Sequence, residues 1–461
     1  MLFSSLEFIF LFLPITVLIY YIVPEKFKNA ILLLSGIIFY GFGEIGLLPI
    51  FLLTIAVDFT LGLLIAGCAE RKRACAARGL LIFAVIFNLS LLGYFKYFDF
   101  FRESVLGLEP IGILLPIGIS FYTFQALSYV IDVYRGTVRA TKNIVSFGAY
   151  IALFPQLIAG PIVKYSDVEE QLRERSVSAS LVASGLRRFI CGLAKKVVLA
   201  NAAGELFVLF CDSNSYISAI LVVFFFGMQI YFDFSGYSDM AIGLGRMLGF
   251  EFVENFNYPY ISRSVSEFWR RWHISLSTFF KEYVYIPLGG SKKGSARTAL
   301  NLLIVWTLTG AWHGAAWGFL LWGGYFALLL MLEKMVLKNI LKRVPKPFLH
   351  AYSMLFVFLG WLIFASDGIT LTENQGVSVF LRLIFINVSE FAAEYELFVL
   401  LGAIPFMLIL IAGSTPLPRR IYLYLTRRIS ALSVIFPLFA FALSLAYIVS
   451  SGYNPFLYFR F

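Results

Sequence analysis

Charged residues are scarce in this chain of 461 residues. Asp, Glu, Lys and Arg together make up 14%, whereas 60% of the residues are hydrophobic and 18% aromatic. A soluble protein of this length does not need so much apolar surface, so the composition excludes a soluble enzyme and predicts a polytopic helical membrane protein. The sequence also lacks internal repeats and long polar stretches. We therefore predict one integral membrane domain over residues 1–461.

Cysteine and histidine are also rare, with four and three residues. The four cysteines, Cys68, Cys75, Cys191 and Cys211, show neither the spacing of metal ligands nor a disulfide framework, so we predict no metal site. The N-terminus has no basic segment before its apolar run and no small-residue cleavage site after it. It is interpreted as a transmembrane helix rather than a removed signal peptide.

Eleven apolar segments are candidates to cross the membrane. They are residues 6–23, 30–43, 47–67, 79–95, 113–131, 189–210, 217–232, 311–332, 349–366, 395–413 and 430–450. Several are shorter than the ~20 residues that a straight crossing needs. We therefore expect broken or re-entrant helices among them.

The distribution of positive charge predicts the topology. If the N-terminus lies outside, the cytoplasmic loops hold all 37 Lys and Arg residues except Lys96, Arg102, Arg382 and Arg460. Cytoplasmic loops are enriched in Lys and Arg, so both termini are predicted to be extracytoplasmic. Residues 298–332 then form a hairpin that enters and leaves on the cytoplasmic side. Because the basic residues lie in short loops between apolar runs, the net charge of +10 does not indicate a nucleic-acid partner.

Two regions do not fit simple membrane helices. Residues 144–175 contain the helix-breaking run FPQLIAGPIV, and we expect a re-entrant element followed by an amphipathic cytoplasmic helix. Residues 251–297 are too polar to span the membrane and too aromatic for a free loop. We expect them to form a partly re-entrant segment on the cytoplasmic face that closes the floor of a cavity.

One histidine stands inside a hydrophobic stretch. His313 lies in TLTGAWHGAAWGFLLWGGYFALLLML, residues 307–332, where an ionisable side chain is costly and usually faces an interior or a cavity. A neutral imidazole can act there as a general base toward a hydroxyl or thiol. Small and aromatic residues that would permit close helix packing and shape a cavity surround it: Gly310, Gly314, Gly318, Trp312, Trp317 and Trp322. The alternative is a histidine that only hydrogen-bonds neighbouring helices.

A second histidine, His273, ends a basic and aromatic run. The residues Trp269-Arg270-Arg271-Trp272 precede it, and Lys281, Lys292 and Lys293 follow. Guanidinium groups suit phosphate through paired hydrogen bonds, so this patch is predicted to bind a phosphorylated donor such as a coenzyme A thioester. The alternatives are an interfacial histidine and basic residues that are attracted to anionic lipid.

Polar residues also interrupt the apolar segment GMQIYFDFSGYSDMAIGLGRMLGF. Those within residues 227–250 are Gln229, Asp233, Ser235, Ser238 and Asp239. Inside a membrane helix they need partners, so they either line a wet interior or join helices. Ser235 lies in FSGYS, which is not the strand-flanked motif of a nucleophilic serine, and we do not predict it to be a nucleophile.

These segments together resemble the membrane-bound O-acyltransferase family, in its bacterial polysaccharide branch. The resemblance covers nearly the whole chain and is carried by LPIGISFYTFQALSYVIDVYRG, FPQLIAGPIVKY, QIYFDFSGYSDMAIGLGRMLGF, NFNYPYISRSVSEFWRRWHISLS, TGAWHGAAWGFLLWG and YNPFLYFRF. It is most similar to the membrane subunit of alginate O-acetylation and more distantly similar to the D-alanyl transfer protein of teichoic acids. The match at TGAWHG implies that His313 is the catalytic histidine, and EFWRRWHISLS implies that His273 is the second site residue.

The resemblance implies an all-α fold of about eleven transmembrane helices around a central tunnel. It also implies an O-acetyltransferase of the bacterial cell membrane. The donor, acetyl-CoA, would bind from the cytoplasm without any permanently bound cofactor. The acetyl group would cross the membrane to a polysaccharide with the help of a separate extracytoplasmic, esterase-like (SGNH) protein. We assign Arg270, Arg271, Lys281, Gln229, Asp233, Ser235 and Trp312 to the donor site or tunnel.

The aromatic C-terminus adds a carrier hypothesis. The teichoic-acid system implies a C-terminal tyrosine as acyl carrier, and Tyr458 is the corresponding candidate here; the alternative is an interfacial anchor. Other functions stay open at this point. They are transfer of a D-alanyl or other acyl group, acylation of a lipid or protein, and, in a different class, a transporter or flippase.

Overall fold

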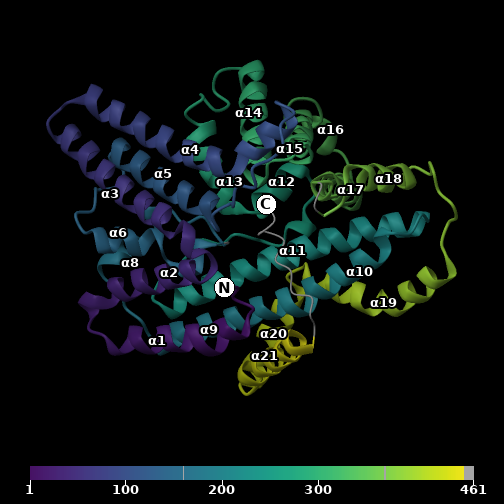
Figure 1. Ribbon diagram of the computed structural model, residues 1–461. Helices are drawn as coiled ribbons and strands as arrows, with labels where there is room; N and C mark the ends of the chain where they lie inside the picture. Colours follow the sequence, from purple (N-terminus) through teal and green to yellow (C-terminus); the bar gives the residue numbers. More distant parts are fainter. Residues whose placement is uncertain (159, 368–369, 451–461) are drawn as a thin grey trace. The chain divides into compact units, whose positions relative to one another are not determined.

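The computed structural model describes residues 1–158, 160–367 and 370–450, and every regular element in these ranges is helical (Figure 1). Among the described residues, seven helical segments are long and apolar enough to cross a membrane. They are Glu25–Glu70, Ala74–Ser104, Tyr216–Met247, Trp317–Val336, Lys346–Ala365, Glu394–Gly413 and Leu432–Ser450. The prediction of an all-helical chain with several candidate spans is confirmed. The count of eleven crossings and the central tunnel stay predictions.

The chain alternates long apolar helices with short helices. In the first half the helices are α1 (Leu13–Ile22), α2 (Lys28–Glu44), α3 (Leu48–Glu70), α4 (Ala74–Ser104), α5 (Ile119–Arg135), α6 (Ile144–Ile151), α7 (Phe154–Leu157), α8 (Tyr165–Arg173), α9 (Ala179–Ala194), α10 (Asn201–Cys211) and α11 (Tyr216–Met247). In the second half they are α12 (Val265–Arg271), α13 (Ile274–Phe280), α14 (Ser295–His313), α15 (Trp317–Met331), α16 (Lys338–Leu341), α17 (Lys346–Ala365), α18 (Glu373–Leu383), α19 (Glu394–Gly413), α20 (Leu417–Arg428) and α21 (Leu432–Ser450).

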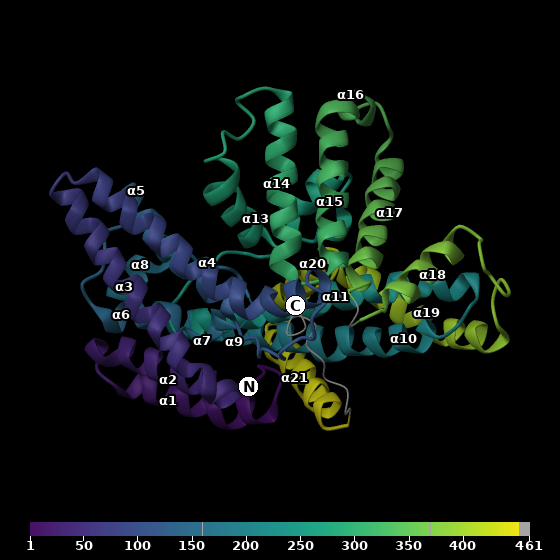
Figure 2. The same cartoon turned by 45° about the horizontal axis from the view of Figure 1, so that its top comes forward.

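Residues 1–190 and 237–253 form one compact unit. In it α3, α4 and α5 pack side by side, and α2 packs against α6 (Figures 1 and 2). Gly36 permits this last contact, because a Cβ atom there would lie 1.8 Å from the carbonyl oxygen of Ala152. The predicted break in residues 144–175 is present, since α6 ends at Ile151 and α7 begins at Phe154 with a proline in its first turn.

Residues 191–236 and 254–461 form the second unit. The structure describes its residues 191–236, 254–367 and 370–450. Its core is aromatic. The ring of Trp269 on α12 packs edge-on against Trp306 of α14, 4.6 Å away between centroids, and against Phe326 of α15, 4.8 Å away. These contacts hold the short helix α12 against the hairpin of α14 and α15, and α17 packs beside α15 (Figure 2).

The hairpin expected from the charge pattern is present, but its turn falls inside the hydrophobic stretch. The helix ends at His313 and resumes at Trp317, so residues 311–332 are not one continuous helix. Gly310, Gly314 and Gly318, whose regular spacing would place them on one face of a continuous helix, are therefore distributed over α14, the turn and α15. Gly310 lies at the crossing of the two arms, where a Cβ atom would be 2.2 Å from the carbonyl oxygen of Phe319.

Candidate functional site

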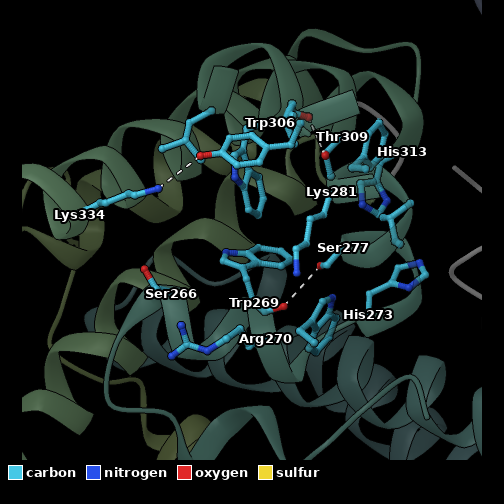
Figure 3. A pocket seen from close by; sticks show the side chains of 16 residues that line it. Ser266, Trp269, Arg270, His273, Ser277, Lys281, Trp306, Thr309, His313 and Lys334 are labelled. Carbon is cyan, nitrogen blue, oxygen red and sulfur yellow. Dashed lines mark hydrogen bonds between the residues drawn. The ribbon is translucent and has the colours of Figure 1, made fainter. Parts of the chain in front are cut away.

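A cavity of about 390 Å³ lies in the second unit, lined by α12, α13 and α14 and by the helical turns that follow α13 and α15 (Figure 3). Its lining residues are Ser266, Trp269, Arg270, Trp272, His273, Leu276, Ser277, Phe280, Lys281, Tyr285, Leu302, Val305, Trp306, Thr309, His313 and Lys334. Both predicted histidines thus line the same cavity, although 40 residues separate them in sequence. Two of the predicted donor-binding cations, Arg270 and Lys281, line it with them.

His313 is held by aromatic rings at the end of α14. The helix stops there because Gly314 adopts an extended conformation, with φ −174° and ψ 166°. The imidazole meets the rings of Trp322 and Phe364 edge-on, with centroid distances of 5.1 and 5.2 Å, and its side chain is buried. These rings limit the positions that the imidazole can take, so it is fixed on the cavity wall.

His273 is placed by an unusual backbone conformation. It precedes α13 with φ 43° and ψ 56°, the left-handed region that most side chains avoid but that Asn, Asp and His adopt more readily. Its Nδ1 lies 3.0 Å from Oδ1 of Asn255, and that oxygen also accepts a hydrogen bond of 2.9 Å from Ser275 Oγ. An amide oxygen can only accept, so the imidazole donates through Nδ1 and carries its lone pair on Nε2.

Burial controls the charge of His273. The side chain is 1% exposed and lies outside the candidate membrane-spanning helices. Burial lowers its pKa to about 3, because the imidazolium would lose its hydration. The ring is therefore neutral at any physiological pH, so it can accept a hydrogen bond at Nε2 but holds no proton there to donate.

Trp312 links the two histidines. Its ring centroid is 5.8 Å from that of His273 and 5.0 Å from that of His313, and the indole side chain is buried. The sequence interpretation assigned Trp312 to the donor site or tunnel, whereas the structure places it beside both imidazoles but outside the cavity lining. Its large rigid ring therefore sets the spacing of the two histidines.

Basic residues line the cavity together with the histidines, and Lys334 is the one that lies farthest from them in the view of Figure 3. In Figure 3, Lys334 lies on the side opposite His273 and His313, with Arg270 and Lys281 between. Lys334 Nζ donates a 3.3 Å hydrogen bond to Tyr285 Oη and lies 5.8 Å from the centre of that ring. The cavity thus has a basic end and a histidine end. Sequence reasoning missed Lys334 and Tyr285, because nothing in their local sequence separates them from anchoring residues.

Sequence reasoning also missed a buried carboxylate beside the cavity. Glu333 follows α15 and is 5% exposed. Its two oxygens accept the backbone N–H groups of Val265, at 2.7 Å, and Ser266, at 2.8 Å. These are orphan donors in the first turn of α12, so Glu333 ties the start of the segment that leads to His273 to the hairpin that carries His313. The sequence feature that could have identified Glu333 is its position as an acidic residue directly after a long apolar segment.

Several predicted site residues lie elsewhere. Gln229, Asp233 and Ser235 are buried on α11 and do not line the cavity. The Asp233 carboxylate lies 2.9 Å from Lys196 Nζ in a buried ion pair, which favours the alternative role of joining helices. Arg271 pairs with Glu267 at 2.9 Å and is also absent from the lining.

Two further predicted groups complete the assignment. Lys292 and Lys293 are exposed and lie outside the cavity lining. Tyr458, the proposed acyl carrier, lies outside the described residues.

Comparison with known proteins places the cavity inside a family signature. Residues 137–373 match the model of MBOAT, the membrane-bound O-acyltransferase family, which is slightly more than half of the chain. All residues that line the cavity lie within this range. The chemistry of the family is therefore to be sought at this cavity.

Individual relatives carry three related activities. The chain is 42% identical to the probable alginate O-acetylase AlgI of Pseudomonas aeruginosa, over 82% of this chain and 75% of that protein. It is 33% identical to a peptidoglycan O-acetyltransferase of Helicobacter pylori, over 80% of this chain and 78% of that protein. It is 26% identical to a teichoic acid D-alanyltransferase of Bacillus subtilis, over 58% of this chain and 71% of that protein.

Proposed function

We propose, from the premise that this chain belongs to the membrane-bound O-acyltransferase family, that it transfers acetyl groups to hydroxyls of an extracellular or cell-wall polysaccharide. The chain is a multi-pass membrane protein and an acyltransferase by its family. The choice of acetyl is supported by the similarity to proteins that are described as O-acetylating alginate and peptidoglycan.

One observation carries the proposal. Two histidines with different surroundings and a set of basic side chains line one cavity of about 390 Å³. This volume falls in the range of small-molecule sites. It suits a thioester with its slender arm, while the phosphates of the donor would stay near Arg270, Lys281 and Lys334. We infer that acetyl-CoA is the donor and that it enters from the cytoplasm.

His313 is the general base of the proposed reaction. Its imidazole takes the proton of the acceptor hydroxyl while that oxygen attacks the carbonyl carbon of the thioester. The new C–O ester bond forms, the C–S bond breaks, and the thiolate of the donor receives the proton from the imidazolium. General base catalysis by a positioned histidine typically contributes 10²–10⁴-fold to the rate, so this step defines the expected effect of removing His313.

His273 has a different role, because it stays neutral. Its Nε2 lone pair can accept a hydrogen bond from an N–H or O–H of the bound substrates other than the reacting hydroxyl, whose single proton goes to His313, whereas Nδ1 is committed to Asn255. Trp312 packs against both rings. We infer that His273 orients the bound substrates while His313 deprotonates the reacting hydroxyl.

The location and the partners follow from the same proposal. The protein would lie in the bacterial cell membrane with both termini outside, so that the acetyl group crosses the bilayer through the protein. A separate extracytoplasmic SGNH-type protein would complete delivery to the polymer. Tyr458 would carry the acetyl group if the C-terminus reaches the cavity. Full acetylation by a Tyr458→Phe variant would remove the carrier from the mechanism.

The test is acetyl transfer from radiolabelled acetyl-CoA by the purified protein in lipid, with the acceptor polysaccharide and the partner protein supplied. His313→Gln should reduce transfer by roughly 10²–10⁴-fold. His350→Gln is the matched control, because His350 bonds the carbonyl of Ser262 and does not line the cavity. Equal loss in both variants, or none in His313→Gln, would contradict the assigned base. Labelled D-alanyl thioester as a competing donor tests the alternative acyl group, which the relative from Bacillus subtilis favours.

A further inference from the structure

The helix α20 (Leu417–Arg428) has a composition that the proposed reaction does not use. It joins α19 and α21, each of which is long and apolar enough to cross a membrane. Twelve residues of helix cannot cross a bilayer, so a connection between two crossing helices lies at one membrane surface. A helix in that position, with the sequence LPRRIYLYLTRR, would face the lipid headgroups.

The charge of α20 is of one sign and uncompensated. Arg419 and Arg420 lie in its first turn, Arg427 and Arg428 in its last, and all four side chains are exposed. No Asp or Glu follows Glu396 in the whole sequence. Over the described part of the chain, no carboxylate lies within ion-pair distance of these four guanidinium groups. Within the described residues, therefore, no acidic group compensates this charge.

The same helix exposes apolar side chains. Leu417, Ile421 and Tyr424 are 52%, 49% and 55% exposed, although α20 is attached to its neighbour through Tyr422, whose ring lies 6.0 Å from that of Phe436 on α21. Tyr424 also supports Arg428, whose guanidinium carbon lies 4.6 Å from the ring centre. A basic helix with exposed apolar residues between its arginines suits the boundary between headgroups and acyl chains.

We propose that α20 is a binding surface for anionic phospholipids of the leaflet that it faces. The Arg419–Arg420 pair and the Arg427–Arg428 pair are eight residues apart, or roughly 12 Å along the helix at 1.5 Å per residue. This spacing lets each pair bind the phosphate of a different lipid through bidentate hydrogen bonds. Leu417 and Ile421 insert at the acyl boundary. The proposal is independent of the acyl-transfer reaction.

The experiment compares the full-length protein in nanodiscs of phosphatidylcholine alone and of phosphatidylcholine mixed with phosphatidylglycerol. The thermal unfolding midpoint and the number of phosphatidylglycerol molecules retained in native mass spectrometry are measured. Phosphatidylglycerol should raise the wild-type midpoint by several degrees. The variant with Arg419, Arg420, Arg427 and Arg428 all changed to Gln should lose this increase and the retained lipids, while its midpoint in phosphatidylcholine stays at the wild-type value.

The chain provides a charge-matched control. Arg71, Lys72 and Arg73 are also exposed and lie between two candidate spans, α3 and α4, and the exposed Arg78 lies near the start of α4. None of the four is on a short amphipathic helix. Changing these four to Gln removes the same charge and should leave the lipid effect intact. Equal losses in the two variants would mean that overall charge attracts the lipid and would overturn the role of α20.

A third measurement does not depend on any variant folding. Concentrated NaCl should remove the phosphatidylglycerol effect from the wild-type protein, because salt screens exposed charges. An effect that persists in high salt would also overturn the proposal.

Discussion

Asn255 and His273 form a buried pair, in which the amide oxygen of Asn255 accepts a hydrogen bond of 3.0 Å from Nδ1 of His273. Asn255 is 1% exposed and holds Ser275 by the same oxygen. The pair decides which nitrogen of His273 is available to the cavity, since a proton on Nδ1 leaves the lone pair on Nε2. The residue thus acts on the reaction through His273 rather than by touching substrate.

Removing Asn255 should therefore impair turnover more than donor binding. Asn255→Leu deletes the acceptor, so the tautomer and the ring orientation of His273 are no longer fixed. We expect kcat to fall roughly ten- to hundred-fold, as for other groups that orient a functional histidine, with the KM for the donor unchanged. Steady-state kinetics with varied donor measure both values.

Asn255→Asp is the conservative counterpart. It retains the acceptor but adds a negative charge beside His273, which favours the imidazolium. Activity should be largely restored at high pH and lost as the pH falls. A pH profile identical to that of the wild-type protein, or full activity of Asn255→Leu, would exclude a positioning role.

The pKa of His273 has a consequence for stability. Burial lowers it to about 3 in the folded protein, whereas an unfolded histidine titrates near 6.5. The unfolded state binds the additional proton, so the stability contribution is present above pH 6.5 and is lost as the pH falls toward 3. Between pH 7 and pH 5 the loss is about 2 kcal/mol in the free energy of unfolding.

A difference measurement isolates this effect. His273→Asn removes the titrating group and keeps a residue that tolerates the left-handed backbone. The unfolding free energy of the wild-type protein minus that of His273→Asn should decrease between pH 7 and pH 5. A difference that is constant over this range would show that His273 does not titrate as an isolated buried base.

Because α14 and α15 cross closely, replacing a glycine by alanine should affect stability differently at the crossing and away from it. A Cβ atom at Gly310 would meet the backbone of Phe319 at 2.2 Å, and backbone cannot move aside without separating the helices. Gly310→Ala should destabilise the protein by about 1–3 kcal/mol, typical of overpacking, and should reduce activity because His313 lies one turn away. Thermal unfolding in detergent and acetyl transfer measure the two effects.

Gly324 on α15 offers the matched control, since nothing lies within 4 Å of a Cβ atom there. Gly324→Ala should be neutral or stabilising by up to about 1 kcal/mol, from the higher helix propensity of alanine. Similar losses at both positions would argue that the crossing does not set the stability of the hairpin.

Lys334 should affect the binding of the donor rather than the rate of the chemical step. Its ammonium group lies at the basic end of the cavity, and exposed charges contribute about 0.2–1 kcal/mol each. Lys334→Gln should therefore raise the KM for acetyl-CoA by roughly two- to five-fold with kcat unchanged. Lys338→Gln, one turn further along the chain and outside the lining, should leave KM unchanged.

A truncated donor locates the interaction of Lys334. Acetyl-pantetheine has no phosphates, so the wild-type protein and Lys334→Gln should use it equally well. A lower kcat for Lys334→Gln with both donors would place Lys334 in the reacting geometry instead.

Hydropathy predicted most apolar helices closely, because lipid contact imposes a composition on each one independently of its neighbours. The segment 395–413 corresponds to α19 (Glu394–Gly413), and 30–43 to α2 (Lys28–Glu44). The same reasoning failed at residues 314–316. That turn separates two apolar helices without adding polarity, so the hydrophobic pattern passes through it unchanged.

The sequence alone determined that this is an all-helical membrane protein, that His313 is an ionisable group in an apolar wall and that a basic patch adjoins His273. Each of these properties belongs to a local segment. The tertiary structure decided that the two histidines line one cavity with Trp312 between them. It also decided that Asn255 fixes the tautomer of His273, that Glu333 ties α12 to the hairpin and that Asp233 is paired with Lys196. These relationships join residues that are far apart along the chain, and such hydrogen bonds and ring contacts form only once the helices have packed against one another.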